Sequence, residues 1–233
     1  MPHRVALHVS EPFSGSATGP VTLVIPCRDE AGSLPGVLAA VPVGYQVVVV
    51  DNGSTDDTAQ VARSHGARVV GESTPGYGAA VHAGVEAAAP SIVCVLDGDG
   101  SLDPGQLPML VDLVRAGADL AVGRRRPTGR SGWPLHARLA NAVIAARLRQ
   151  RFDLPVHDIG AVRAARKDTL LSLGVQDRRS GYPLELLVRA GRAGLRIEER
   201  DVTYRPRSAG RSKVSGSVWG SAVATWDFLK VIR

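Results

Sequence analysis

Short runs of β-branched and other apolar residues recur along this chain, and segments with helical spacing separate them. The runs cover residues 21–26, 46–50, 67–70, 92–96 and 118–122. Continuous rather than alternating hydrophobicity is typical of a parallel strand that is covered on both faces. Strands that alternate with helices predict a doubly wound sheet. We therefore expect an α/β fold with a mostly parallel sheet flanked by helices.

The pattern changes after Arg124, where a basic loop precedes longer elements. Helices are expected over 136–151 and 183–193, and an extended strand over 195–204. The chain shows no internal repeat and no linker that would separate a second domain, and its 233 residues suffice for one large core. We expect a single domain over residues 20–213.

The two ends of the chain differ from this domain in composition. Residues 1–19 are rich in Ser, Gly and Pro and lack the basic start and apolar core of a signal peptide, so a flexible tail is expected. Residues 214–233 place Trp226 and Leu229 near one face of an amphipathic helix. A membrane interface, the domain itself or a dimer partner would each cover that face.

Charge and composition narrow the class of partner. The net charge of +6 and the pI near 9.9 favour anionic ligands. Aromatic residues make up only 4% of the chain, which argues against a stacking platform for single-stranded nucleic acid. No apolar run reaches the roughly 18 residues of a transmembrane helix. We expect a cytoplasmic protein, with peripheral contact at the inner face of the membrane left open, and no nucleic-acid partner.

Polar clusters come directly after four of the expected strands. They are Arg28-Asp29-Glu30, Asp51-Asn52-Gly53-Ser54, Asp97-Gly98-Asp99 and Gly123-Arg124-Arg125. In open α/β sheets the carboxyl ends of parallel strands meet at one rim, and ligands bind there. The four clusters are therefore expected to converge on one crevice.

Asp97 and Asp99 give the sharpest chemical expectation. Two carboxylates this close repel each other unless a cation joins them, and a hard divalent cation prefers oxygen ligands. Gly98 and Gly100 remove side-chain bulk and let the backbone approach a ligand. An EF-hand loop starting at Asp97 would need glycine where Leu102 stands. The pair therefore predicts a divalent metal site that holds a nucleotide-sugar diphosphate.

Further motifs follow in a fixed order. The first half contains Ile25-Pro26-x-x-x-Glu30, Val50-Asp51-x-Gly53-Ser54-x-Asp56, Gly76-x-Gly78-x-Ala80 and Asp97-x-Asp99. The second half contains Leu102-Asp103-Pro104, Val122-Gly123-x-Arg125, Asp158-Ile159-Gly160-Ala161-Val162-Arg163 and a basic segment over 204–213. From about Val21 to Lys213 this order resembles the inverting GT-A glycosyltransferases of family 2, and within them the polyprenyl- or dolichyl-phosphate sugar synthases. The resemblance implies a GT-A fold and transfer of a hexose from a UDP- or GDP-sugar.

The resemblance also implies roles for individual residues in donor binding. Asp51 would accept hydrogen bonds from the base, uracil or guanine. The remaining donor-site residues would be Pro26, Arg28, Glu30, Gly53, Gly76, Gly78, Asp97 and Gly98, with Arg207, Arg211 and Lys213 adding cations near the diphosphate. A tight turn before a helix explains Gly76 and Gly78 equally well.

For the metal, the resemblance implies Mg²⁺ or Mn²⁺ on Asp97 and Asp99. Ser101 stands where relatives often carry glutamine, so either its hydroxyl or a water molecule would be the third ligand of the metal. The metal would neutralise the leaving nucleoside diphosphate.

The acceptor implied by the resemblance is a polyprenyl phosphate, which is already ionised and needs no strong base. Arg125 would orient it, and Arg138 and Arg163 are further candidates. A soluble small-molecule acceptor is the alternative, and an alcohol would need a carboxylate base worth about 100- to 10,000-fold in rate. Asp158 and Glu185 are the candidate bases, although an ion pair with arginine explains Glu185 equally well. A nucleotidyltransferase is a weaker alternative, because the chain has no glycine-rich lysine loop near its start.

Overall fold

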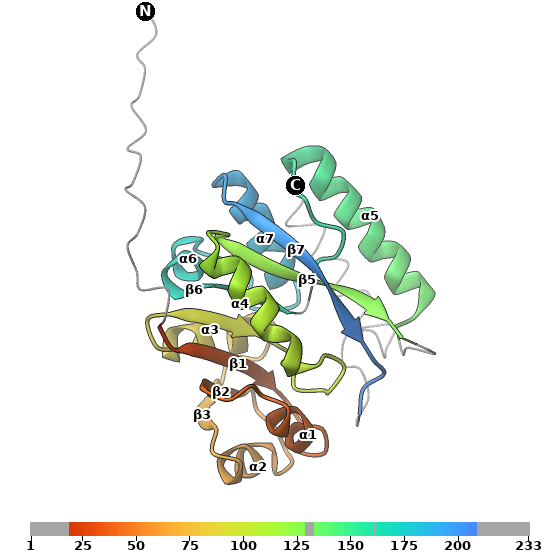
Figure 1. Cartoon of the computed structure of the whole chain (residues 1–233). Helices are drawn as coiled ribbons and strands as arrows, with labels where there is room; N and C mark the ends of the chain where they lie inside the picture. The colour runs from red at the N-terminus through yellow and green to blue at the C-terminus, as the bar shows by residue number, and fades with distance from the viewer. Residues whose placement is uncertain (1–18, 129–132, 161, 209–233) are drawn as a thin grey trace, which may run out of the picture.

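The structure is a computed structural model that describes residues 19–128, 133–160 and 162–208 (Figure 1). The expected N-terminal tail, apart from residue 19, and the expected helix over 214–233 lie outside the described residues. Arg211 and Lys213, which were expected near the donor phosphates, also lie outside them.

In the described part of the chain, seven strands form one sheet in the order β3-β2-β1-β4-β6-β5-β7 (Figure 1). Their bounds are β1 (Val21–Cys27), β2 (Tyr45–Asp51), β3 (Arg68–Gly71), β4 (Ile92–Val95), β5 (Leu120–Pro127), β6 (Arg163–Arg166) and β7 (Ile197–Tyr204). Only β6 runs antiparallel to its neighbours, β4 and β5. The expected mostly parallel α/β sheet is confirmed.

Helices cover both faces of the sheet (Figure 1). Their bounds are α1 (Leu34–Ala39), α2 (Thr58–Ser64), α3 (Tyr77–Ala87), α4 (Leu107–Arg115), α5 (Leu135–Phe152), α6 (Lys167–Ser172) and α7 (Tyr182–Arg192). The helices α1, α2 and α4 contribute to one core, and α3, α5, α6 and α7 to the other. Within the described ranges, none of these helices combines the length and the apolar character that crossing a membrane requires.

The central strands are apolar along their whole length because each face of the sheet meets its own core. Val24 and Val50 pack into the core formed with α3 and α7, whereas Leu23, Ile25 and Val49 pack into the opposite core. All five side chains are fully buried. This is the double coverage that the continuous hydrophobic runs predicted.

Two expectations about the second half need correction. The sequence analysis missed β6, whose four residues are two arginines around Ala164 and Ala165, a composition without β propensity. It also ended the fifth strand at 122, but β5 continues to Pro127 because β7 pairs with it residue by residue up to Tyr204. Arg125 therefore lies within a strand and not in a loop after one.

The sheet opens between the carboxyl ends of β1 and β4. Pairing of these two strands ends at Val24 and Val95, while β1 stays paired with β2 to its last residue. The Cys27 carbonyl accepts the Asn52 amide on the β2 side. Successive residues of a strand direct their backbone polar groups to opposite sides, so Pro26 faces β4, and because it lacks an N–H it offers no donor there. The strand order reverses at this place, and such switch points are where ligands bind in α/β sheets.

The packing of α3 on the sheet generates a testable prediction about stability. A Cβ atom at Gly84 would lie 2.2 Å from Cγ1 of Val24 and 2.9 Å from Cγ2 of Val50. Gly84→Ala should lower the free energy of unfolding by about 1–2 kcal/mol, because overpacking costs more than the gain in helix propensity. Gly36→Ala in α1 is the matched control, because no atom lies within 4 Å of a Cβ there.

Gly36→Ala should leave the free energy of unfolding unchanged or raise it by about 0.5–1 kcal/mol. Urea denaturation of the two variants and the wild type measures both effects. Equal stability of the two variants would contradict the close approach of α3 to β1 and β2.

Candidate functional site

The loops after β1 and β2 are joined by hydrogen bonds into one wall of the crevice. The Asp29 amide donates to Oγ of Ser54 at 3.0 Å, and the Glu30 amide donates to Oγ1 of Thr58 at 2.8 Å. Asp51 Oδ1 accepts the Ser54 amide at 3.0 Å. The first two polar clusters are thus brought together as expected. Arg28 extends into solvent at the edge of this wall.

Asn52 fixes the next loop and was not singled out by the sequence analysis. Its buried Nδ2 donates to the carbonyls of Glu72 at 2.9 Å and Thr74 at 2.8 Å, and its Oδ1 accepts the Gly76 amide at 2.8 Å. Gly53 beside it adopts a φ of +73°. The available signal was an amide directly after a buried strand, a position that suits loop stapling as well as ligand binding.

Gly76 and Gly78 are explained by close packing on the loop before α7. A Cβ atom would lie 2.2 Å from the Arg178 carbonyl oxygen at Gly76 and 2.5 Å from the Asp177 carbonyl oxygen at Gly78. The Gly78 amide donates to the Arg179 carbonyl at 3.0 Å. Because the amides of both glycines are already bonded, the structure favours the tight-turn interpretation over direct donor binding.

Asp97 and Asp99 lie directly after β4, at the opening beside β1. Gly98 between them packs so closely that a Cβ atom would lie 2.7 Å from Cys27 Sγ. The Gly98 carbonyl also accepts the Ser33 hydroxyl at 2.8 Å. The loop that carries both carboxylates is therefore fixed against the end of β1.

The two carboxylates have different surroundings. Asp99 is buried, forms an ion pair with Nη2 of Arg207 at 2.9 Å and accepts the Ser101 amide at 2.9 Å. Oδ1 of Asp97 is buried and has no hydrogen bond of standard geometry among the described residues, and the buried Tyr77 hydroxyl, which interacts with this carboxylate, has none either. Burial, reinforced by the charge of Asp99, raises the pKa of Asp97 to about 7. Three cations oppose this rise, on Arg163, Arg207 and Arg125.

This arrangement fits a hard divalent cation. Asp97 offers a buried carboxylate oxygen without a hydrogen bond of standard geometry in the described part of the chain, and Asp99 adds a second carboxylate two residues away. No third Asp, Glu, His or Cys side chain joins them among the described residues, so a ligand or water would supply the other oxygens. The buried Ser101 uses its amide on Asp99 and its carbonyl on the Arg205 amide, contacts that hold the loop.

The segment after β7 crosses the acidic pair. Arg207 contacts Asp99 and also lies 3.6 Å from Oε1 of Glu30, so it connects the loops after β4 and β1. The Ser208 amide donates to the Asp99 carbonyl at 3.1 Å. Gly100 adopts a φ of +73°, and a Cβ atom there would lie 2.3 Å from Ser208 Oγ. A basic residue more than a hundred positions downstream thus reaches the site, as expected.

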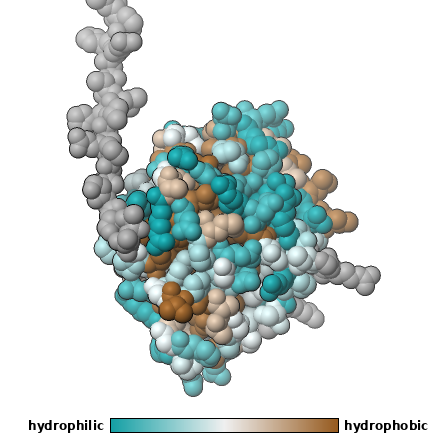
Figure 2. Space-filling model, viewed as in Figure 1, coloured by the Kyte–Doolittle hydropathy of each residue, from teal (hydrophilic) through white to brown (hydrophobic). Residues whose placement is uncertain are grey.

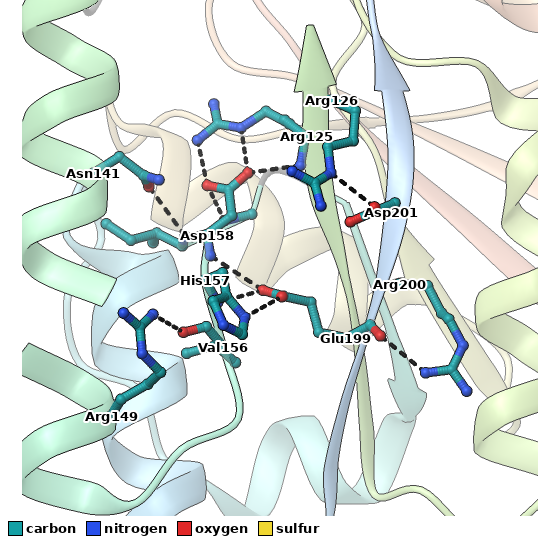
Figure 3. Close-up of polar contacts among 12 residues, drawn as sticks. Arg125, Arg126, Asn141, Arg149, Val156, His157, Asp158, Glu199, Arg200 and Asp201 are labelled. Atoms are coloured by element: carbon teal, nitrogen blue, oxygen red, sulfur yellow. Dashed lines mark hydrogen bonds and ion pairs between the residues drawn. The ribbon is translucent and has the colours of Figure 1, made fainter. Parts of the chain in front are cut away.

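Arg125 and Asp158 form a buried bidentate ion pair (Figure 3). Nε of Arg125 donates to Oδ2 at 2.8 Å, Nη2 donates to Oδ1 at 2.7 Å, and the Arg125 amide adds a third bond to Oδ2 at 2.9 Å. The guanidinium lies 4.0 Å from the ring centre of Trp133 and 5.7 Å from that of Tyr204. These contacts fix both the direction and the plane of the guanidinium.

Glu199 on β7 holds the loop that carries Asp158 (Figure 3). Its Oε1 accepts the amides of His157 at 2.6 Å and Asp158 at 3.1 Å, and its Oε2 pairs with Nδ1 of His157 at 2.9 Å. The sequence analysis passed over Glu199, because a charged residue in a strand is typical of a solvent-facing position.

The structure argues against both candidate bases. The Arg125 guanidinium holds the pKa of Asp158 below its usual range although burial alone would raise it. Glu185 accepts the amides of Gln176 and Asp177 and pairs with Arg189, and these contacts lower its pKa against the effect of burial. Glu185 is thus explained by the ion-pair alternative, and Asp158 acts as a partner of Arg125.

Arg163 is one further cation of the site; the sequence analysis named it as a candidate for the acceptor phosphate but did not predict its place on β6 or its effect on Asp97. It lies on β6 opposite Val95 of β4, is 2% exposed, and donates from Nη2 to the Gly160 carbonyl at 2.9 Å. Its positive charge lowers the pKa of Asp97 against the effect of burial. Arg138, the other candidate for the acceptor phosphate, is exposed on α5.

Comparison with known proteins matches residues 22–172 to the family described as Glycosyl transferase family 2. An "Uncharacterized glycosyltransferase" of Mycobacterium tuberculosis is 61% identical over 91% of this chain and 97% of its own length. The undecaprenyl-phosphate mannosyltransferase of Micrococcus luteus is 34% identical over 87% of this chain and 90% of its own. Glucosyl-3-phosphoglycerate synthase of M. tuberculosis, crystallised with Mn²⁺, UDP and glucosyl-3-phosphoglycerate, superposes with a TM-score of 0.74. That structure is 25% identical, and the match covers 100% of this chain and 86% of that one.

The raised pKa of Asp97 predicts a pH-dependent difference between the wild type and Asp97→Asn in the absence of metal. A folded-state pKa above the unfolded one contributes stability at low pH that is lost as the pH rises. From about pH 4 to its folded-state pKa of about 7, the wild type should lose up to about 4 kcal/mol of stability that the Asp97→Asn variant retains.

Urea denaturation in the presence of a chelator measures this difference at each pH. If Asp97 is a metal ligand, saturating Mn²⁺ at about pH 8 should then stabilise the wild type and not the variant, because a ligand that binds only the native state raises stability by mass action. If the free energy of unfolding of the two proteins changes with pH in parallel, the raised pKa does not belong to Asp97.

Proposed function

The chain belongs to glycosyl transferase family 2, and on that premise we propose a metal-dependent, inverting hexosyltransferase that uses a nucleotide-sugar donor and a polyprenyl phosphate acceptor. The observation that carries the proposal is the acidic pair at the switch point of the sheet. Asp97 has a buried oxygen without a hydrogen bond of standard geometry among the residues described, and Asp99 beside it is balanced by Arg207. A divalent cation would supply positive charge between the two carboxylates, and the oxygens of a bound diphosphate would complete its ligands.

The donor nucleoside would lie on the wall formed by the loops after β1 and β2. Pro26 leaves the β4 side of β1 without an amide donor at the opening. Asp51 is partly exposed there and would accept hydrogen bonds from the base. Arg28, Glu30, Gly53 and Gly98 border the same space. The wall does not distinguish uracil from guanine, because a carboxylate accepts from either.

The diphosphate would lie between the acidic pair and the segment after β7. A bound Mg²⁺ or Mn²⁺ would neutralise the negative charge that develops on the leaving group. Arg207 would then exchange Asp99 and Glu30 for phosphate oxygens, with each charge-assisted hydrogen bond worth about 1.5–3 kcal/mol. Arg211 and Lys213 would add to this charge.

The acceptor phosphate would lie against Arg125. Asp158 and the Trp133 ring hold the guanidinium in a fixed plane, and a planar guanidinium suits bidentate contact with a phosphate. A phosphate oxygen is ionised at neutral pH and attacks without a base. This agrees with the bonded states of Asp158 and Glu185, both of which are poor proton acceptors.

A second candidate is transfer to a soluble phosphorylated acceptor. The similarity to glucosyl-3-phosphoglycerate synthase over the full chain supports it. Such an acceptor carries both a phosphate that Arg125 would bind and a hydroxyl that must lose a proton. The two candidates therefore differ in their need for a base.

The acidic pair predicts loss of transfer in Asp99→Ala. Removing one of the two carboxylates should lower the rate of transfer by about 100-fold or more, as the loss of charge stabilisation at a leaving group does. Asp103→Ala is the matched control, since Asp103 lies four residues after Asp99, caps the short 3₁₀ helix Pro104–Gln106 and stands outside the pair. Release of UDP or GDP from labelled sugar nucleotides with Mn²⁺ and polyprenyl phosphate measures transfer, and thermal melting checks the fold. Failure to consume any donor, or full activity of Asp99→Ala with a chelator present, would refute the proposal.

The Arg125–Asp158 pair predicts coupled effects on the acceptor. Arg125→Gln and Asp158→Asn should each lower kcat/KM for polyprenyl phosphate by about 10- to 100-fold, and the double variant should lose little more. Arg126→Gln is the neighbouring control, because that side chain is half-exposed and pairs with Asp201. A change in the pH profile of Asp158→Asn, with Arg125→Gln unaffected, would instead identify Asp158 as a base and favour an alcohol acceptor.

A further inference from the structure

The outward face of α5 exposes large apolar side chains. Leu135, Leu139 and Val143 are 78%, 69% and 55% exposed. Among the residues that the structure describes, only Val43 and Met109 are other exposed large hydrophobic residues. Figure 2 shows apolar surface at the right-hand edge of the molecule, where Figure 1 places α5. This surface is thus concentrated on one helix.

These side chains form a continuous stripe. Leu135, Leu139 and Val143 are spaced by four residues and so share one face of the helix, and the exposed Ala142 and Ala146 continue it. The opposite side of α5 packs on the domain through buried residues such as Leu148. One side of the helix therefore packs in the core of the domain, and a second apolar side faces outward.

Cations border the stripe on both sides. The helix contains four arginines and no aspartate or glutamate. Of the exposed ones, Arg138 lies along one edge of the stripe, and Arg147 and Arg151 lie along the other. Neither Arg138 nor Arg147 forms an ion pair with a carboxylate in the described part of the chain. An apolar stripe with arginines at its borders is typical of a helix that lies in a lipid interface.

We infer that the outward face of α5 docks on an anionic lipid surface. Charge disfavours the main alternatives: a two-fold contact through this face would bring the arginines of both copies into one interface. Residues 209–233 of the chain carry four Lys or Arg and one Asp, so this segment repeats the charge of α5 and does not complement it. Anionic headgroups complement the arginines while the acyl chains accept the leucines.

The docking face begins two residues after Trp133, which contacts Arg125 of the proposed acceptor site. The Arg125 guanidinium stacks on the Trp133 ring at 4.0 Å. A docked α5 would therefore hold Arg125 near the level of the headgroups, where a membrane-anchored prenyl chain presents its phosphate. This link rests on the proposed function, whereas docking itself is measurable without any transfer.

Co-sedimentation of the full-length, donor-free protein with vesicles tests the inference. The wild type should bind vesicles of equal parts phosphatidylcholine and phosphatidylglycerol, and bind pure phosphatidylcholine at least about tenfold more weakly. The triple variant L135S/L139S/V143S should lose about tenfold or more in binding to the anionic vesicles. R138Q/R147Q should lose about fivefold per arginine, and this loss should shrink in high salt.

Matched controls come from other exposed positions. Val43→Ser and Arg63→Gln alter exposed side chains away from α5 and should leave vesicle binding unchanged. Thermal melting of every variant checks that the fold is retained, and gel filtration reports the oligomeric state.

Three results would overturn the inference. They are absence of wild-type binding to anionic vesicles, undiminished binding by the triple variant, and conversion of a dimer to a monomer by the triple variant. Transfer to polyprenyl phosphate in detergent separates docking from function. If transfer occurs but vesicle binding does not depend on α5, the docking inference is wrong and the proposed function stands. If vesicle binding depends on α5 but no transfer occurs, the docking inference stands and the proposed function fails.

Discussion

Mutual repulsion of Asp97 and Asp99 is the constraint around which the site is built. The two carboxylates are held by a loop that is fixed against β1, so they cannot relieve the repulsion by moving apart. The fold instead brings arginines to them from three separate elements, Arg125 from β5, Arg163 from β6 and Arg207 after β7. The basic second half of the chain is thus the electrostatic counterpart of the acidic first half.

The support of these arginines differs, and the difference divides the site into fixed and exchangeable parts. Arg125 is bound along one edge of its guanidinium by both carboxylate oxygens of Asp158, whose loop is in turn held by Glu199 (Figure 3). Arg163 is buried in the sheet itself. Arg207, by contrast, belongs to a chain segment beyond the last strand, and it pairs with Glu30 and with Asp99, the second of which a bound cation would also contact.

The sequence predicted the first half of the fold well, because each strand there is a continuous apolar run and each polar cluster follows its strand directly. The second half was less predictable for physical reasons. The β6 strand pairs through its backbone while its side chains include a buried arginine, so no hydrophobic pattern marks it. The Arg125–Asp158 pair joins residues 33 positions apart, and nothing local distinguishes such a carboxylate from a free base. The stapling role of Asn52 and the positioning role of Glu199 likewise depend on partners that are distant in sequence.

The close packing of Gly98 has a consequence for how this chain can vary. A side chain at position 98 would collide with Cys27 Sγ at 2.7 Å and approach Ile25 Cγ2 at 3.2 Å, so the space between the two carboxylates is shared with the end of β1. A larger residue at 98 requires the Cys27 side chain to shift or to be replaced by a smaller one. The spacing of the acidic pair and the end of the first strand are therefore inherited as one unit, and correlated substitution at these two positions is the trace that it should leave among homologous sequences.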